Sequence, residues 1–139
     1  MDLKNIECPC NGKGMSILAG PWILLTLYRE GDSHGYEIKT KIAQHLAQHG
    51  IGMNVTGIYR HLKQLEQRGM VSSKWVTSGK GAARCRYQLT AGGRQCLEHW
   101  LQTLTVQMLL IGSFFEQARQ VFPDVPLPVV QELSTVYRL

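Results

Sequence analysis

The sequence predicts a mainly α-helical fold with a small β-hairpin: a winged helix-turn-helix domain followed by a C-terminal dimerisation helix. Three segments with apolar residues at helical spacing precede two segments rich in β-forming residues, and a long apolar repeat follows them. Positive charge is concentrated in the same middle part of the chain. We therefore expect an N-terminal arm over residues 1–14, the winged domain over residues 15–90 and a C-terminal helical dimerisation region over residues 91–139.

The first two helices are expected to form the base of the domain. MSILAGPWILLTLY (residues 15–28) is apolar nearly all round, which indicates a buried helix that Pro21 either starts or kinks. GDSHG (residues 31–35) is expected to form a turn, with Ser33 as a candidate N-cap. A second, amphipathic helix is expected from Tyr36 to about residue 50, since apolar residues recur there at a spacing of four: Ile38, Ile42 and Leu46.

A third helix and a hairpin are expected to follow. Asn54 offers the N-cap of this helix, Gly69 is expected to end it, and its apolar stripe consists of Ile58, Leu62 and Leu65. MVSSKWVT (residues 70–77) and RCRYQLT (residues 84–90) are rich in β-forming residues and flank the small, flexible SGKGAA. These segments predict a hairpin with a basic tip.

A long helix is expected from Ala91 until PDVPLP (residues 123–128) breaks it, with a short final helix within residues 129–139. Apolar residues alternate along it at spacings of four and three, the heptad pattern of a helix that packs against a partner. A second apolar set, Trp100, Leu110, Phe114 and Val121, widens this surface, so a second chain is its natural cover. The expected dimerisation residues are Leu97, Leu101, Leu104, Met108, Ile111, Phe115 and Phe122, with Ala118 in the same repeat.

Charge and composition narrow the class of protein. Residues 34–94 contain 10 basic and 2 acidic side chains, a net charge of +8, whereas the rest of the chain carries 5 basic and 8 acidic side chains, a net charge of −3. A segregated basic block favours a nucleic-acid partner. The N-terminus does not resemble a secretory signal, and no apolar run approaches the ~20 residues that span a bilayer. We therefore expect a cytoplasmic protein without a membrane partner, and four cysteines that are reduced.

Three helices followed by a basic-tipped hairpin is the element order of a winged helix-turn-helix. In this fold the third helix enters the major groove of double-stranded DNA. Its exposed N-terminal half is expected to present Thr56, Tyr59, Arg60 and Lys63. Arginine and lysine pair with guanine or with phosphate, and a helix start can hold a phosphate. The hairpin would lay Lys80, Arg84 or Arg86 along the neighbouring backbone or minor groove.

Several of these motifs resemble the PadR family of bacterial transcriptional regulators. They are HGYEI (residues 34–38), GIYRHLKQLEQRGMV (residues 57–71), SSKW followed by GKGAARCRYQLT, and the glycine pair after Thr90. Their combination and order are specific, although each piece alone is weak. The resemblance implies a homodimeric winged-helix regulator, usually a repressor, that binds pseudo-palindromic operators. In many members a small-molecule effector or a stress signal releases the DNA.

The resemblance also implies which residues face DNA. The family often has a run of basic residues before its Tyr-x-Leu-Thr, whereas Ala82, Ala83 and Cys85 interrupt the run here, so fewer wing contacts are expected. Tyr59 has a second interpretation as a structural aromatic at the helix interface. The candidate DNA-binding residues are Tyr36, Lys39, Asn54, Thr56, Gly57, Tyr59, Arg60, Lys63, Lys80, Arg84 and Arg86.

Other functions are kept as alternatives. Trp100 is a candidate for lining an effector site, with packing in the core or the dimer interface as the other interpretation. Cys8 and Cys10, with Cys96, are weak candidates for a metal or redox sensor. A protein-interaction module built on the winged helix is the alternative from another class. The sequence has no G-x-S-x-G or H-E-x-x-H motif, so neither an enzyme nor a cofactor is expected.

Overall fold

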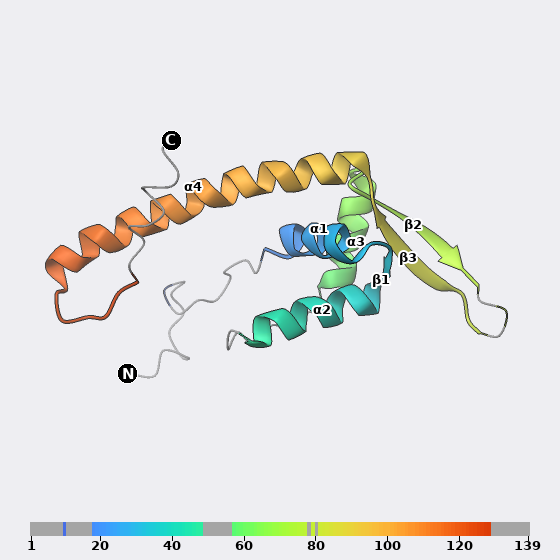
Figure 1. The fold of residues 1–139 in the computed structure, drawn as a ribbon, viewed down its shortest axis with the longest axis horizontal. Helices are drawn as coiled ribbons and strands as arrows, with labels where there is room; N and C mark the ends of the chain where they lie inside the picture. Colours follow the sequence, from blue (N-terminus) through green and yellow to red (C-terminus); the bar gives the residue numbers. More distant parts are fainter. Residues whose placement is uncertain (1–9, 11–17, 49–56, 78, 80, 129–139) are drawn as a thin grey trace. The chain divides into compact units, whose positions relative to one another are not determined.

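The computed structural model describes residues 10, 18–48, 57–77, 79 and 81–128. The contacts within the chain define two compact units, and the division between Leu97 and Glu98 falls within the last helix. No helix in the described segments is long and apolar enough to cross a membrane. The elements, labelled in Figure 1, are α1 (Ala19–Glu30), β1 (Ser33–His34), α2 (Gly35–Gln48), α3 (Ile58–Gln67), β2 (Val71–Val76), β3 (Arg84–Leu89) and α4 (Ala91–Val121).

Helix α1 confirms that Pro21 marks the start of a helix. Leu18 has a left-handed backbone conformation with a φ of 59°, and the helix starts at Ala19. Pro21 then lies in the first turn, where its missing N–H leaves no hydrogen bond unmade. The predicted burial of this helix holds for one side only, because Leu25 and Tyr28 are exposed.

The three N-terminal helices form the core of the first unit. Helix α1 contacts α2, α3 and β3, and α2 contacts α3. The predicted apolar stripes of α2 and α3 are confirmed, because all six of their residues are buried. The largest fully buried side chains are Ile23, Leu24, Ile38, Ile42, Ile58, Leu62 and Val71.

Helix α3 ends in a tight turn that feeds directly into β2. Gly69 has a φ of 76°, a conformation that glycine adopts without steric cost. The Met70 N–H donates to the Leu65 carbonyl at 2.9 Å, and the Gly69 N–H donates to the Glu66 carbonyl at 3.0 Å. This pair of hydrogen bonds is the Schellman motif, so the predicted stop at Gly69 is confirmed.

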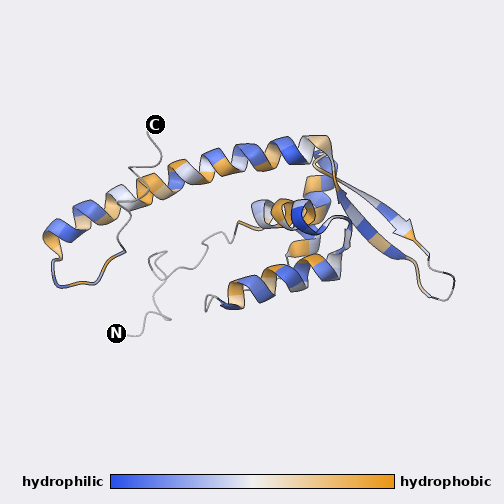
Figure 2. Ribbon diagram, in the orientation of Figure 1, coloured by the Kyte–Doolittle hydropathy of each residue, from blue (hydrophilic) through white to orange (hydrophobic). Residues whose placement is uncertain are grey.

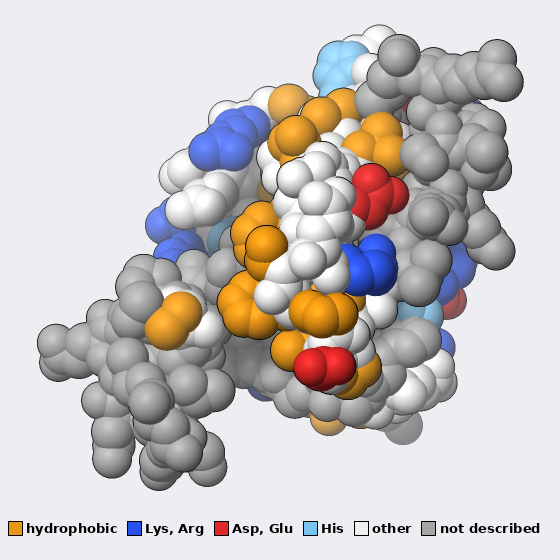
Figure 3. Space-filling view, turned by 90° about the vertical axis from the view of Figure 1, so that its left-hand side faces the viewer, with side chains coloured by type: hydrophobic (Ala, Val, Ile, Leu, Met, Phe, Trp, Pro, Cys, Tyr) orange, Lys and Arg blue, Asp and Glu red, His pale blue; other side chains and the backbone are white. Residues whose placement is uncertain are grey.

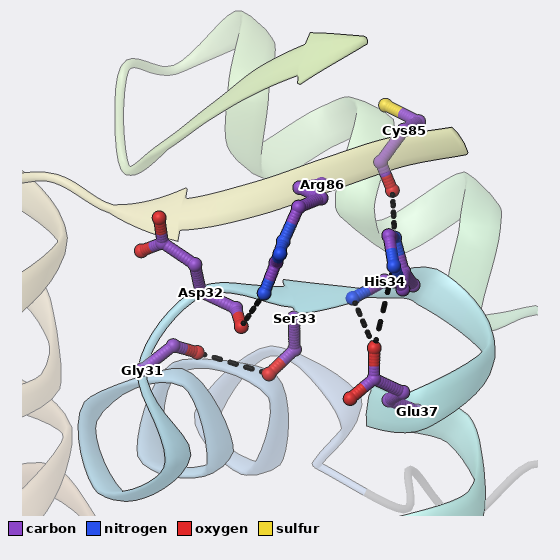
Figure 4. Close-up of polar contacts among 7 residues, drawn as sticks. All are labelled: Gly31, Asp32, Ser33, His34, Glu37, Cys85 and Arg86. Carbon is purple, nitrogen blue, oxygen red and sulfur yellow. Dashed lines mark hydrogen bonds and ion pairs between the residues drawn. The ribbon is translucent and has the colours of Figure 1, made fainter. Parts of the chain in front are cut away.

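The predicted hairpin is confirmed, and a third strand extends it. Strands β2 and β3 pair antiparallel, and the two-residue strand β1 pairs with the other edge of β3, giving the order β1-β3-β2. Ser33 therefore belongs to a strand, and its hydroxyl donates to the Gly31 carbonyl at 2.9 Å instead of capping α2. His34 directly precedes α2, and its N–H donates to Glu37 Oε1 at 3.2 Å, which is half of a capping box (Figure 4).

Helix α4 begins at Ala91, as predicted, against the turn at Gly69. The Gly93 N–H donates to Thr90 Oγ1 at 3.0 Å, and this hydroxyl oxygen lies 2.7 Å from the Gly69 carbonyl oxygen. A Cβ atom at Gly93 would collide with the Met70 carbonyl oxygen, so the close approach of the helix start to the turn requires glycine there. The helix ends at Val121, just before the predicted break at Pro123.

Candidate nucleic-acid interface

The exposed face of α3 carries two of the predicted cations. Burial of Ile58, Leu62 and Leu65 directs Arg60 and Lys63, in the N-terminal half of the helix, into solvent. Neither cation has a carboxylate partner within the described parts of the chain. Cations that the fold itself does not neutralise are free to meet phosphate or a base edge.

Tyr59 combines both of its interpretations. A Cβ atom at Gly35 would lie 2.5 Å from Tyr59 Cε1, so the ring packs closely over the start of α2. The side chain nevertheless remains 49% exposed. One part of Tyr59 therefore contacts α2 while the rest is accessible to a partner.

The hairpin presents three cations on one face. Lys74 lies directly opposite Arg86, and Val76 lies opposite Arg84. Since side chains alternate along strands, Lys74, Arg84 and Arg86 project from the same side of the sheet. Like charges directly opposite each other are destabilising, which a bound anion would relieve.

Arg86 differs from the other two cations. Its Nη2 donates to the Asp32 carbonyl at 3.1 Å, and the side chain is half-buried, whereas Lys74 and Arg84 are exposed (Figure 4). Its Nε is buried and has no hydrogen-bond partner among the described residues. Arg86 thus joins β3 to the α1–β1 loop, a role that the local sequence pattern does not indicate.

A pocket of about 530 Å³ lies between the hairpin and the starts of α2 and α3. It brings together three predicted residues, Tyr36, Tyr59 and Arg84. Burial, followed by a side-chain hydrogen bond with Cys85, raises the pKa of Tyr87 to about 12, so this hydroxyl stays protonated. The other lining residues had no predicted contact with DNA, although they lie in the HGYEI motif and in the predicted second strand of the hairpin: His34, Gly35, Glu37, Cys85 and Tyr87.

The other described residues that were predicted to bind DNA do not line this pocket. Lys39 is half-buried on α2, and Gly57 directly precedes α3. Asn54, Thr56 and Lys80 lie outside the described residues, as does the predicted arm over residues 1–14 except for Cys10.

Helix α4 carries an exposed apolar surface in the second unit. Leu101, Met108, Ile111 and Phe122 of the predicted repeat are each more than half exposed, and so are Leu110, Phe114 and Val121. Hydrophobic residues recur along the helix in Figure 2, and Figure 3 shows hydrophobic side chains gathered on one face of the molecule. Leu104, Phe115 and Trp100 are half-buried.

Leu97 departs from the predicted dimerisation set. It is only 7% exposed and belongs to the first unit, where it forms part of the core. A side chain already buried in its own chain has little apolar surface left for a partner. The final helix predicted within residues 129–139 lies outside the described residues.

The described cysteines do not form a metal site. Cys85 and Cys96 are half-buried and not in disulfides, and Cys10 is exposed. No group of three or more histidine, cysteine, aspartate or glutamate side chains among the described residues could hold a metal ion. Cys8, the other half of the predicted pair, lies outside these residues.

Three helices, a Schellman turn into a hairpin, and unpaired cations on α3 and the hairpin define a winged helix-turn-helix protein. Comparison with known proteins refines this class. The model of the transcriptional regulator PadR-like family matches residues 23–99, more than half of the chain. The chain therefore belongs to the PadR-like family of transcriptional regulators.

Individual relatives agree with this assignment. The negative transcriptional regulator PadR of Bacillus subtilis (strain 168) is 30% identical over 80 residues, which cover 58% of this chain and 43% of that protein. The chain thus spans less than half the length of this curated relative. A candidate transcriptional regulator from Thermoplasma acidophilum is similar in structure, with a TM-score of 0.59, 26% identity and coverage of 71% of this chain and 91% of the other. A PadR family regulator from Eggerthella lenta has a TM-score of 0.54 and 26% identity, covering 70% and 83%.

Proposed function

We propose that this protein is a sequence-specific DNA-binding regulator in which α3 reads the major groove and the β2–β3 hairpin contacts the adjacent backbone. The observation that carries the proposal is the set of exposed cations without carboxylate partners in the described chain: Arg60 and Lys63 on α3, and Lys74 and Arg84 on the hairpin. Arg60 is suited to the bidentate pairing that distinguishes guanine, whereas the hairpin cations are suited to phosphate.

We further propose that it acts as a homodimer. The exposed apolar residues of α4 follow a heptad spacing, and burying them against a second copy would remove a large apolar surface from water. A dimer presents two copies of α3, so the expected target is an inverted repeat with half-sites about one helical turn apart. The name of the Bacillus subtilis relative, a negative regulator, supports repression as the outcome. Release by a small-molecule effector or stress signal is part of the same proposal.

The test is fluorescence-anisotropy binding to labelled duplexes from the DNA upstream of the protein's own gene. Each titration is run at two salt concentrations and with an excess of unrelated duplex. We expect tight binding to one duplex that survives the competitor and weakens steeply with salt, because each phosphate contact contributes about 0.9 to the slope of log K against log salt. Equal affinity for all duplexes would contradict sequence-specific recognition.

A further inference from the structure

The segment from Asp32 to Glu37, where β1 passes into α2, touches both DNA-facing elements; we call it the β1–α2 junction. On the hairpin side, His34 Nδ1 donates to the Cys85 carbonyl at 3.3 Å and Arg86 Nη2 donates to the Asp32 carbonyl at 3.1 Å. On the side of α3, the Tyr59 ring packs over Gly35. Figure 4 shows the hydrogen bonds to β3 converging on this short segment.

The side-chain bonds matter because the backbone pairing here is short. Strand β1 has two residues, which pair Ser33 with Tyr87 and His34 with Arg86. A pairing of this length fixes the edge of a hairpin weakly. The His34 and Arg86 hydrogen bonds add two attachment points on either side of that pairing, at Cys85 and Asp32.

His34 is itself held in place. Its backbone N–H donates to Glu37 Oε1 at 3.2 Å, and its Nε2 lies 3.7 Å from the same oxygen. Since a carbonyl can only accept, the Cys85 contact requires a proton on Nδ1. The imidazole therefore bridges the first turn of α2 and the end of β3 that is nearer the hairpin loop.

We propose that His34 is a positioning residue that sets the orientation of the hairpin relative to α3, so that the hairpin cations reach phosphates while α3 lies in the groove. This inference rests on the proposed DNA-binding function. It assigns to the junction a role in DNA affinity although His34 need not touch DNA.

The test compares the salt dependence of DNA binding for wild type, His34→Ala and His34→Asn. His34→Ala removes the bond to Cys85, and we expect roughly 3- to 10-fold weaker binding, the change that corresponds to one hydrogen bond. We also expect the salt slope to fall by about one to two, because Lys74 and Arg84 no longer meet phosphates together with α3. The side-chain amide in His34→Asn can replace Nδ1 as a donor. This variant should therefore recover much of the wild-type DNA affinity and of the wild-type salt slope.

A matched control separates positioning from simple destabilisation. Gly93→Ala disturbs the contacts of α4 with Met70 and with Leu89 at the base of the hairpin, at the opposite end of β3 from Cys85 and Arg86. It should lower the melting temperature and leave the salt slope unchanged, since the molecules that remain folded keep all their phosphate contacts. A slope for His34→Ala equal to that of wild type would overturn the inference.

Hydrogen exchange tests the inference without DNA. The amides of residues 84–87 should exchange about 3- to 10-fold faster in His34→Ala than in wild type, because the attachment of β3 to the junction is lost. Unchanged exchange would overturn the inference. If wild type binds no duplex, the proposed function fails, and this exchange measurement alone decides whether His34 holds the hairpin.

Discussion

Arg60 and Arg68 are exposed arginines at opposite ends of α3. Only Arg60 is expected to contact a base in the proposed complex with DNA. Arg60 lies in the N-terminal half that enters the groove, whereas Arg68 follows the last helical residue. Arg60→Ala should weaken binding to the preferred duplex by about 1–3 kcal/mol if it pairs with a base. Arg68→Ala is the matched control and should have little effect. Equal losses, measured by anisotropy, would mean that only general charge is involved.

The adjacent glycines of α4 allow a stability test. Gly93→Ala would force a methyl group against the Met70 carbonyl, whereas a Cβ at Gly92 would make ordinary contacts, the nearest with the Gly69 carbonyl oxygen at 3.5 Å. We expect Gly93→Ala to cost about 1–3 kcal/mol of unfolding free energy. Gly92→Ala should be neutral or stabilising by up to about 1 kcal/mol, because alanine favours helix. Urea unfolding measures both; similar losses would contradict the described approach of α4 to the turn.

Tyr87 predicts a change in stability at high pH. Its pKa rises from 10.0 to about 12 in the folded chain, so the unfolded chain releases the proton first. The associated stability is present below pH 10 and is lost as the pH rises toward about 12. Tyr87→Phe removes this ionisation, so its unfolding free energy should fall less steeply with pH than that of wild type across this window. Parallel curves would show that Tyr87 does not ionise in this way.

The sequence predicted the roles of residues that depend on local spacing, and it missed contacts between residues far apart in the chain. Arg60 and Lys63 were identified because helical spacing alone places them opposite the apolar stripe of α3. The bond from Arg86 to Asp32 joins residues far apart in the sequence, and nothing in the local pattern of either residue indicates it. The sequence allowed Tyr59 a structural role at the helix interface, but no local pattern identifies Gly35 as the residue that its ring contacts.

Among the elements, α2, α3, the hairpin and the start of α4 were predicted, because each has a long enough period or a clear stop residue. Strand β1 was missed because two residues show no alternation, and only the pairing with β3 makes them a strand. The heptad spacing of α4 does not identify what each residue packs against. Leu97 fits the repeat, but it is buried within its own chain.

The exposed apolar face of α4 is the proposed dimer interface, so a charge placed on it should weaken dimerisation. Ile111 is 53% exposed in the single chain. Ile111→Glu would bury an unpaired carboxylate in the proposed interface, so it should weaken dimerisation by about 3 kcal/mol or more. Gln102→Glu, an exposed position on the opposite side of the helix, is the control and should leave dimerisation unchanged. Sedimentation equilibrium measures both, and a stable Ile111→Glu dimer would show that this face is not the interface.

In the whole molecule, the proposed DNA-binding cations and most of the exposed apolar residues lie in different units. The first unit holds the described cations of α3 and the hairpin, and the second holds most of the exposed apolar residues. Such a division suits a protein whose one part binds DNA and whose other part pairs two copies. Membership of the PadR-like family places the chain among transcriptional regulators.

Hydroxyl-radical footprinting on the preferred duplex tests the central claim most directly, because it reports DNA contact and dimer geometry together. We predict two protected segments on one face of the duplex, related by a two-fold axis and centred about 10 base pairs apart, with flanking protection that weakens in Arg84→Ala. A single protected segment, or uniform protection along the duplex, would contradict recognition by two symmetry-related α3 helices.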